Sequence, residues 1–476
     1  MMHRTDVTTS DERQLSLPLT PLRNRDFLSN HWLEHRLPLE PEWQEEQANA
    51  ESALKRLVSL WQVERERVSL YGDEAGLEEK FIQPVFEILG WKLKYQAYLD
   101  RREPDYALFV NDNSLDGALQ AGRKSPDFWS HASVVADAKA WHISLDRPMR
   151  VGSKREYPPE QIEWYINRSL CDYGILTNGR LWRLVPRVLG PSKPRFQTYL
   201  ELDLPALLEG ILPSEGALDL GPTTEQLETF FCFYLLFSPV GFVSVDDRKP
   251  LVTRAVEGSS EYSLGVGEEL KDRVFEALRL CIDGFVKHEK NGLDPETGLN
   301  ECQEHSFIFL YRLLFILYAE DRGLLPYRIN QTYTKNRSLA RHRDEVAVRL
   351  DQFSAKLRPD YDADSTALWD DLNDLFDLID RGHRRYGVQA YNGGLFDLEA
   401  ESFLSRMVLP DPYLARVLDQ LGRAPQPGRP DLGLFRVDYR DLAIQQLGSV
   451  YEGLLELIPK YAEKDVRVYR SSSSKN

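Results

Sequence analysis

Two short stretches of the chain carry residues that could hold a metal ion. Asp105 begins the stretch P-D-Y-A-L-F at 104–109, and Asp137 and Lys139 end the stretch V-V-A-D-A-K at 134–139. Both stretches are typical of β-strands, in which residues two apart point to the same face. Carboxylate oxygens suit a hard cation such as Mg²⁺, and a lysine beside them can orient or deprotonate a water. This layout predicts metal-dependent hydrolysis of a phosphodiester bond, provided that the two strands are neighbours.

An amphipathic helix is predicted over residues 76–89, ending at Gly90. Its apolar residues recur at helical spacing and form one stripe: Leu77, Phe81, Val85 and Ile88. Glu78 lies beside that stripe, where a carboxylate must be paired, hydrogen-bonded or bound to metal. Glu79 is better explained as a solvated residue of the first helical turn.

A second helix is predicted to begin at Pro158, because proline is tolerated in the first turn. Gln161 and Tyr165 are four residues apart and share a face of it. They could flank the metal site or contact a phosphate, or Tyr165 could pack in the core. The following residues 173–184 predict a β-hairpin with a type I′ turn at Asn178-Gly179.

Taken in order, these elements resemble the amino-terminal nuclease domain of type IIG restriction-modification enzymes. They are also similar to the nuclease part of type I restriction subunits, and both belong to the PD-(D/E)xK superfamily. The resemblance covers about residues 70 to 190. It implies an α+β fold, a restriction-endonuclease-like mixed sheet flanked by helices. It further implies roles for six residues: Asp105, Asp137 and Glu78 as metal ligands, Lys139 as the catalytic lysine, and Gln161 with Tyr165 as a trailing polar element.

Two other motifs compete with this interpretation. Asp127 also precedes Asp137 in a P-D…D-x-K pattern, but it fits the start of a helix better than a strand. The alternation of apolar residues after Asp105 favours that aspartate instead. The segment 117–125 nearly spells a phosphate-binding loop, but its lysine stands one place late. No ATP site is therefore expected.

Composition narrows the class of protein. The 476 residues are 42% hydrophobic, which predicts two or three folded domains. No run of 18 apolar residues suggests a membrane span, and the first residues lack an apolar signal region, so a cytoplasmic protein without membrane contact is expected. The four cysteines have no paired spacing, which argues against a zinc site or disulfides.

A net charge of −16 repels DNA at a distance, so any contact with DNA must come from local clusters of basic residues. The cluster that follows the D-x-K stretch ranks highest: Arg147, Arg150, Lys154 and Arg155. Two further clusters lie in the second half: Lys335, Arg337, Arg341 and Arg343, then Arg381, His383, Arg384 and Arg385. Any one cluster taken singly is more often a solvated face.

The chain divides into four predicted parts. Residues 1–50 form an N-terminal arm, polar over the first twenty residues and helical after them; residues 51–215 form the nuclease domain. Residues 216–267 are predicted to be a helix and a Gly/Ser-containing linker. Residues 268–476 form a mostly α-helical domain, in which the apolar segment 307–323 predicts a buried helix ended by Gly323.

The second half resembles the helical connector that precedes an adenine methyltransferase in type IIG enzymes. The resemblance lies in residues 313–326, 391–396 and 447–455. Glu320, Asp321 and Tyr391, which lie in these segments, could touch DNA or a partner, but are better explained as residues that cap helices and fix turns. The sequence has neither a glycine-rich cofactor loop nor an N-P-P-[FY] tetrapeptide. The expected chain is therefore a restriction subunit whose partner is a separate adenine methyltransferase or specificity subunit, or a fragment from a truncated or split gene.

Together these features predict a Mg²⁺-dependent, site-specific deoxyribonuclease of type II. It would act on double-stranded DNA in a restriction-modification or phage-defence system. The alternative is a DNA-binding scaffold, or a partner subunit of an adenine-specific DNA methyltransferase, that does not cleave. A DNA methyltransferase proper is a third and weaker class.

Overall fold

The computed structural model describes most of the chain in two compact units. The described residues are 21–71, 74–151, 154–189, 196–212, 221–294, 297–327, 329–353, 361–391, 393–397, 402–426, 429–442, 446–449 and 452; the side chains of 150, 151, 154, 426 and 429–432 are not described. Unit 1 comprises residues 1–28 and 32–257, and unit 2 comprises residues 29–31 and 258–476. Each unit has its own hydrophobic core.

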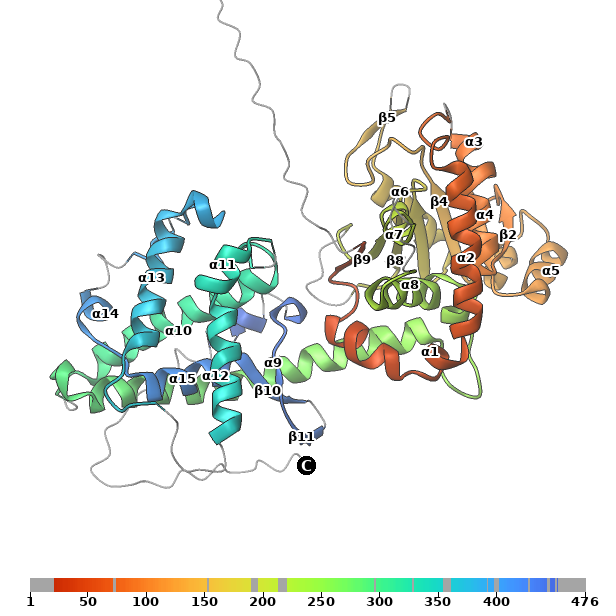
Figure 1. Cartoon of the computed structure of the whole chain (residues 1–476). Helices are drawn as coiled ribbons and strands as arrows, with labels where there is room; N and C mark the ends of the chain where they lie inside the picture. Colours follow the sequence, from red (N-terminus) through yellow and green to blue (C-terminus); the bar gives the residue numbers. More distant parts are fainter. Residues whose placement is uncertain are drawn as a thin grey trace, which may run out of the picture. The chain divides into compact units, whose positions relative to one another are not determined.

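Unit 1 is built on a mixed seven-stranded sheet in the order β1-β9-β8-β7-β4-β3-β2 (Figure 1). Strands β4 and β7 are parallel, and all other neighbouring pairs are antiparallel. The strands of this sheet are β1 Leu22–Arg25, β2 Lys92–Tyr95, β3 Tyr106–Phe109, β4 Val134–Ala138, β7 Tyr173–Thr177, β8 Leu181–Pro186 and β9 Tyr199–Asp203. A separate hairpin pairs β5 Met149–Val151 with β6 Lys154–Glu156.

Helices cover both faces of this sheet. The α-helices of unit 1 are α1 Pro41–Glu45, α2 Gln47–Glu64, α3 Glu74–Leu77, α4 Gln83–Leu89, α5 Asp112–Ala121, α6 Pro158–Ser169, α7 Leu204–Ile211 and α8 Thr224–Phe237. Short π-helical segments are η1 Trp32–Arg36 and η3 Glu78–Ile82, and 3-10 turns are η2 Leu37–Leu39, η4 Pro126–His131 and η5 Pro239–Phe242. Apolar residues of α2, α4, α7 and α8 share one core with the sheet, whereas those of α6 and η4 share another.

Strand register decides which of these two faces each side chain meets. Tyr106 pairs with Ala136, and both belong to the core that contains α2 and α4. Ala107 pairs with Val135, and both belong to the core that contains α6. Because side chains alternate along a strand, Asp137 shares the face of Val135 and therefore lies on the α6 side.

Unit 2 is mostly helical. Its helices are α9 Leu251–Lys287, which begins in unit 1, α10 Leu299–Asp321, α11 Gln331–Asn336, α12 Leu339–Phe353, α13 Ala367–Arg381, α14 Ser402–Arg406 and α15 Asp411–Gly422. The 3-10 turns η6 Glu289–Asn291, η7 Arg384–Tyr386 and η8 Tyr439–Asp441 and the hairpin β10 Arg423–Gln426 with β11 Arg429–Arg436 complete it. The predicted apolar segment lies in α10, which is followed by Gly323 at φ +72°.

Tyr391 and two residues at the end of α10, all of which could have contacted a partner, serve the fold of unit 2. Glu320 accepts hydrogen bonds from the backbone nitrogens of Leu339 and Ala340, both at 2.8 Å, and thereby caps the start of α12. Asp321 pairs with Arg436 at 2.6 Å. Tyr391 donates its hydroxyl to the carbonyl of Leu324 at 3.0 Å. The structural interpretation of these residues is confirmed.

The structure confirms a mixed sheet flanked by helices and followed by a largely helical part, but three local predictions were wrong. The arm predicted to be helical contains strand β1, whose backbone completes the sheet beside β9. The predicted linker contains the first turns of α9, because Val252 and Val266 are buried and packing outweighs the low helix propensity of glycine and serine. The β7–β8 turn is not of type I′, since only Gly179 of its two central residues has a positive φ.

Among the described helices, none combines the length and the apolar character that crossing a bilayer would require.

A candidate metal-binding site beside β3 and β4

Asp105 lies immediately before β3 and is held against the neighbouring strand. Its Oδ2 accepts a hydrogen bond from the backbone nitrogen of Ala138 at 2.7 Å. This contact follows from the antiparallel register, in which Tyr106 pairs with Ala136. The structure therefore brings the two stretches selected from the sequence together, and it places Asp105 beside the D-x-K residues.

Asp137 and Lys139 form a buried ion pair at the end of β4. Lys139 Nζ lies 2.5 Å from Asp137 Oδ2, and the exposed fractions of the two residues are 5% and 2%. Lys139 Nζ also donates to the carbonyl of Ala138 at 2.6 Å. The backbone nitrogen of Lys139 donates to Thr177, which extends the parallel pairing of β4 with β7 and fixes the lysine stem.

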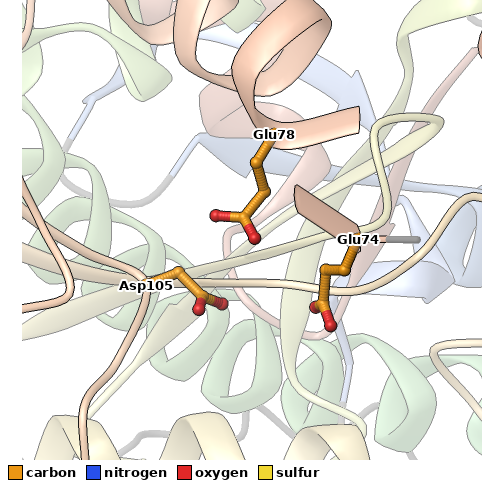
Figure 2. A group of neighbouring side chains, drawn as sticks. All are labelled: Glu74, Glu78 and Asp105. Atoms are coloured by element: carbon orange, nitrogen blue, oxygen red, sulfur yellow. The ribbon is translucent and has the colours of Figure 1, made fainter. Parts of the chain in front are cut away.

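Two glutamates from the helix on the other side of the sheet complete the cluster. Glu74 begins α3 and Glu78 begins the π-helical segment η3. One carboxylate oxygen each from Glu74, Glu78 and Asp105 lies within 4.8 Å of the other two. Figure 2 shows the three carboxylates directed toward a common space. The three ligand oxygens thus come from one helical segment and from the residue that precedes β3.

Glu74 is the residue that sequence reasoning missed. The helix was expected to start at residue 76, whereas α3 starts at Glu74. The signal was present, since residues four apart share a helical face and Glu74 precedes Glu78 by four. Asp137 does not belong to this trio; its Oδ2 lies 2.5 Å from Lys139 Nζ.

Crowding of carboxylates in a buried place makes their charged forms costly. Burial raises the pKa of Glu78 to about 7, and Glu74 and Asp137 add to the shift, which the nearby Tyr106 hydroxyl partly opposes. Burial and the negative charge of Asp137 also raise the pKa of Asp105 well above its usual range.

One ammonium group offsets part of this negative charge. Burial alone would lower the pKa of Lys139, but the surrounding carboxylates, Asp137 first, raise it, so the lysine stays charged. Lys139 Nζ lies 3.8 Å from Glu74 Oε1 as well. Four carboxylates around a single ammonium leave the cluster short of positive charge.

These residues fit a hard divalent cation. All donors of the trio are carboxylate oxygens, the ligands preferred by Mg²⁺ and Ca²⁺. Ligands of a bound Mg²⁺ are roughly 3–4 Å apart, given Mg–O distances of about 2.1 Å, and the three oxygens lie within 4.8 Å of one another. Glu78 Oε2 is buried and has no hydrogen bond from any described residue. A cation there would satisfy this oxygen and neutralise the excess charge.

Gln161 and Tyr165 lie on α6 and contact each other. Gln161 Nε2 donates to the Tyr165 hydroxyl at 3.2 Å. Tyr165 is buried at 4% exposure in the core that contains α6, so it packs in the core, as the alternative interpretation expected. Burial raises the pKa of Tyr165, and the charge of Asp137 adds to that shift. A role for both residues beside the metal or at a phosphate stays a prediction.

The predicted DNA-binding cluster lies on and around the β5–β6 hairpin. Arg147 and Arg155 are exposed, while the side chains of Arg150 and Lys154 lie outside the described residues. A DNA-binding role for these four stays a prediction. In the second cluster Arg343 is buried at 1% exposure and cannot contact DNA.

Comparison with known proteins gives one distant relative. The chain is 22% identical over 427 residues to a protein of Methanocaldococcus jannaschii named "Putative type II restriction enzyme and methyltransferase". The alignment covers 82% of this chain and 31% of that protein, so the chain spans about a third of the length of the curated relative it matches. No family model matches the chain. No solved structure matches it.

Proposed function

We propose that the chain is a Mg²⁺-dependent endonuclease subunit of a restriction-modification system, with a PD-(D/E)xK-type site in unit 1. The observation that carries the proposal is the convergence of Glu74, Glu78 and Asp105 beside the Asp137–Lys139 pair. The name of the distant relative, which joins a restriction enzyme to a methyltransferase, supports the same class of activity. The substrate is the phosphodiester backbone of double-stranded DNA.

In this proposal the cation is held by three carboxylates, those of Glu74, Glu78 and Asp105. Asp137 would become a further ligand if Lys139 moved away from it. A bound Mg²⁺ supplies positive charge for the scissile phosphate and lowers the pKa of the attacking water. Lys139 is charged, so it acts first as a cation that stabilises the developing negative charge or orients the water. The hydrogen bond from Ala138 keeps the Asp105 carboxylate directed into the site.

Part of the proposal concerns partners. The name of the relative includes a methyltransferase, and the alignment covers only 31% of that protein. We therefore propose that this chain acts with an adenine methyltransferase or specificity subunit in restriction-modification and phage defence.

Cleavage of plasmid DNA by the full chain with Mg²⁺ tests the activity, with and without an added methyltransferase partner. Wild type should cut, and Lys139→Ala should cut at least 100-fold more slowly. Lys80→Ala is the matched control, because Lys80 is an exposed lysine of the adjoining helix that pairs with Glu79, and it should cut like wild type. No cutting under either condition would favour the scaffold that binds without cleaving. Equal cutting by wild type and Lys139→Ala would contradict a nuclease site at Lys139.

A further inference from the structure

A strained turn in unit 1 presents basic side chains close to the carboxylate cluster. Leu99 and Arg102 exchange backbone hydrogen bonds at 2.7 and 2.9 Å, which closes a tight turn between them. Its two central residues, Asp100 and Arg101, have φ values of +45° and +67°. Such left-handed backbone is unfavourable for both side chains and is usually supplied by glycine or asparagine.

The structure around the turn holds this conformation in place. Leu99 is buried in the core that contains α6, and the indole nitrogen of Trp129 donates to the carbonyl of Tyr98 at 2.9 Å. The backbone nitrogen of Gln96 donates to the carbonyl of Asp105 at 2.8 Å, so the loop closes on a residue of the site itself. Arg102 and Asp105 are three residues apart, a span of at most about 10 Å between their Cα atoms.

Aromatic rings position several cations of this region. The Arg102 guanidinium lies 4.5 Å from the centre of the Trp164 ring, and that of Arg168 lies 5.7 Å from it. Trp164 directly precedes Tyr165 on α6. Lys124 Nζ lies 5.9 Å from the centre of the Tyr98 ring. Stacking on an aromatic face restricts a long side chain and leaves its charge available to an anion.

Five exposed cations gather on these elements, here called the turn patch: Arg101, Arg102, Arg123, Lys124 and Arg168. Arg123 is tied to the loop by a hydrogen bond to the carbonyl of Gln96 at 3.0 Å. The acids of the turn itself are Asp100 and Glu103, and Asp100 lies 3.5 Å from Arg168. The five cations therefore outnumber the acids of the turn, on a chain of net charge −16.

We infer that the turn patch holds the phosphate backbone of duplex DNA next to the carboxylate cluster. This inference rests on the proposed function and deepens it, because it assigns the surface that delivers the scissile phosphate. Cations spaced along a turn and a helix suit successive phosphates, whose neutralisation releases counterions and drives binding. Arg101 and Arg102 are both exposed on this turn, where they can reach a phosphate.

Binding of a short fluorescent DNA duplex to the full chain, measured by anisotropy without divalent cation over a range of salt, tests the inference. The double variant Arg102→Ala/Lys124→Ala should bind on the order of tenfold more weakly, with a salt slope smaller by about two. Arg102→Lys should keep the slope, because it keeps the charge, and lose less affinity. The matched control is Lys55→Ala/Arg56→Ala, which removes two exposed charges from α2 and should leave affinity within about twofold.

Two results would overturn the inference: binding by Arg102→Ala/Lys124→Ala with the affinity and slope of wild type, or equal weakening by Lys55→Ala/Arg56→Ala. Failure of the proposed function looks different, since the wild type would then bind DNA through the turn patch and leave it uncut when Mg²⁺ is added. If wild type cuts DNA and the patch variant binds DNA normally, the DNA-binding role of the turn patch is contradicted and the proposed nuclease function is not. A near-ultraviolet circular dichroism spectrum of each variant identifies loss of binding that comes from misfolding.

Discussion

Asp105 Oδ2 lies 2.7 Å from the backbone nitrogen of Ala138, so a carboxylate before β3 is fixed by the residue between Asp137 and Lys139. This hydrogen bond fixes the position of the Asp105 carboxylate relative to Asp137 and Lys139. Burial and the charge of Asp137 make the ionised form of that carboxylate unfavourable and raise its pKa. The cluster is consequently organised for ligand binding at some expense in stability.

We predict that removing this charge stabilises the protein in the absence of metal. Asp105→Asn keeps an oxygen that can accept from Ala138 and relieves the repulsion, so the free energy of unfolding in EDTA should rise by about 0.5–2 kcal/mol. Stabilisation by added Mg²⁺ should disappear in the same variant. Thermal unfolding with EDTA and with Mg²⁺ measures both effects, and the exposed Glu103→Gln serves as the control. A destabilised Asp105→Asn that still responds to Mg²⁺ would contradict the prediction.

The Asp137–Lys139 ion pair gives a second prediction. Lys139→Ala leaves Asp137 buried beside Asp105 without its counter-ion, which should cost about 3–5 kcal/mol of stability. Adding Asp137→Ala to that variant should recover part of the loss, because the uncompensated charge is gone. Urea unfolding of the two single variants and the double variant gives the coupling free energy. Strictly additive losses would show that the pair is not an energetic unit.

Much of unit 1 follows from its sequence pattern. Apolar alternation selected β3, which begins directly after Asp105, and Gly90 ends its helix with φ +99° as expected of a C-cap glycine. These features are local, and each is set by a few neighbouring residues. They were sufficient to select Glu78, which the structure brings close to Asp105.

The remaining features depend on contacts distant in the sequence. Strand β1 is short and mostly polar, and it becomes a strand because β9 offers an unpaired edge. Asn178 precedes the two central residues of its turn, because its backbone nitrogen bonds to the carbonyl of Leu181 at 3.4 Å, and its side chain accepts from the backbone nitrogens of Arg180 and Leu181. The engagement of Asp137 by Lys139 likewise depends on rotamers and burial that spacing does not reveal.

A pH-dependent prediction concerns Glu320 in unit 2. Burial raises its pKa to about 7, and hydrogen bonds from Tyr333, Ala340 and Leu339 only partly offset that shift. Because the pKa of Glu320 is higher in the folded state than in the unfolded state, its protonation stabilises the folded protein. This contribution is complete below the unfolded pKa near 4.5 and is lost as the pH rises through about 7. The difference between pH 4 and pH 8 should be roughly 3 kcal/mol.

Glu320→Gln should remove that pH dependence. Its amide would present a donor to a backbone N–H, so it should be less stable than wild type at pH 8 by about 1–3 kcal/mol. Hydrogen exchange of the α10 and α12 amides at pH 5 and pH 8, corrected for intrinsic rates, compares the two proteins. An equal pH dependence in both would show that Glu320 titrates normally.

Divalent-ion binding tests the central claim most directly. Electron paramagnetic resonance of Mn²⁺ titrated with the full chain should show saturable binding by wild type that Mg²⁺ displaces. Glu74→Gln, Glu78→Gln and Asp105→Asn should each weaken it by at least about tenfold, whereas Glu79→Gln, an exposed neighbour on the same helix, should bind like wild type. Binding that is lost in the three variants and kept in Glu79→Gln is the predicted result; binding that survives in all three, or is absent from wild type, would contradict the account.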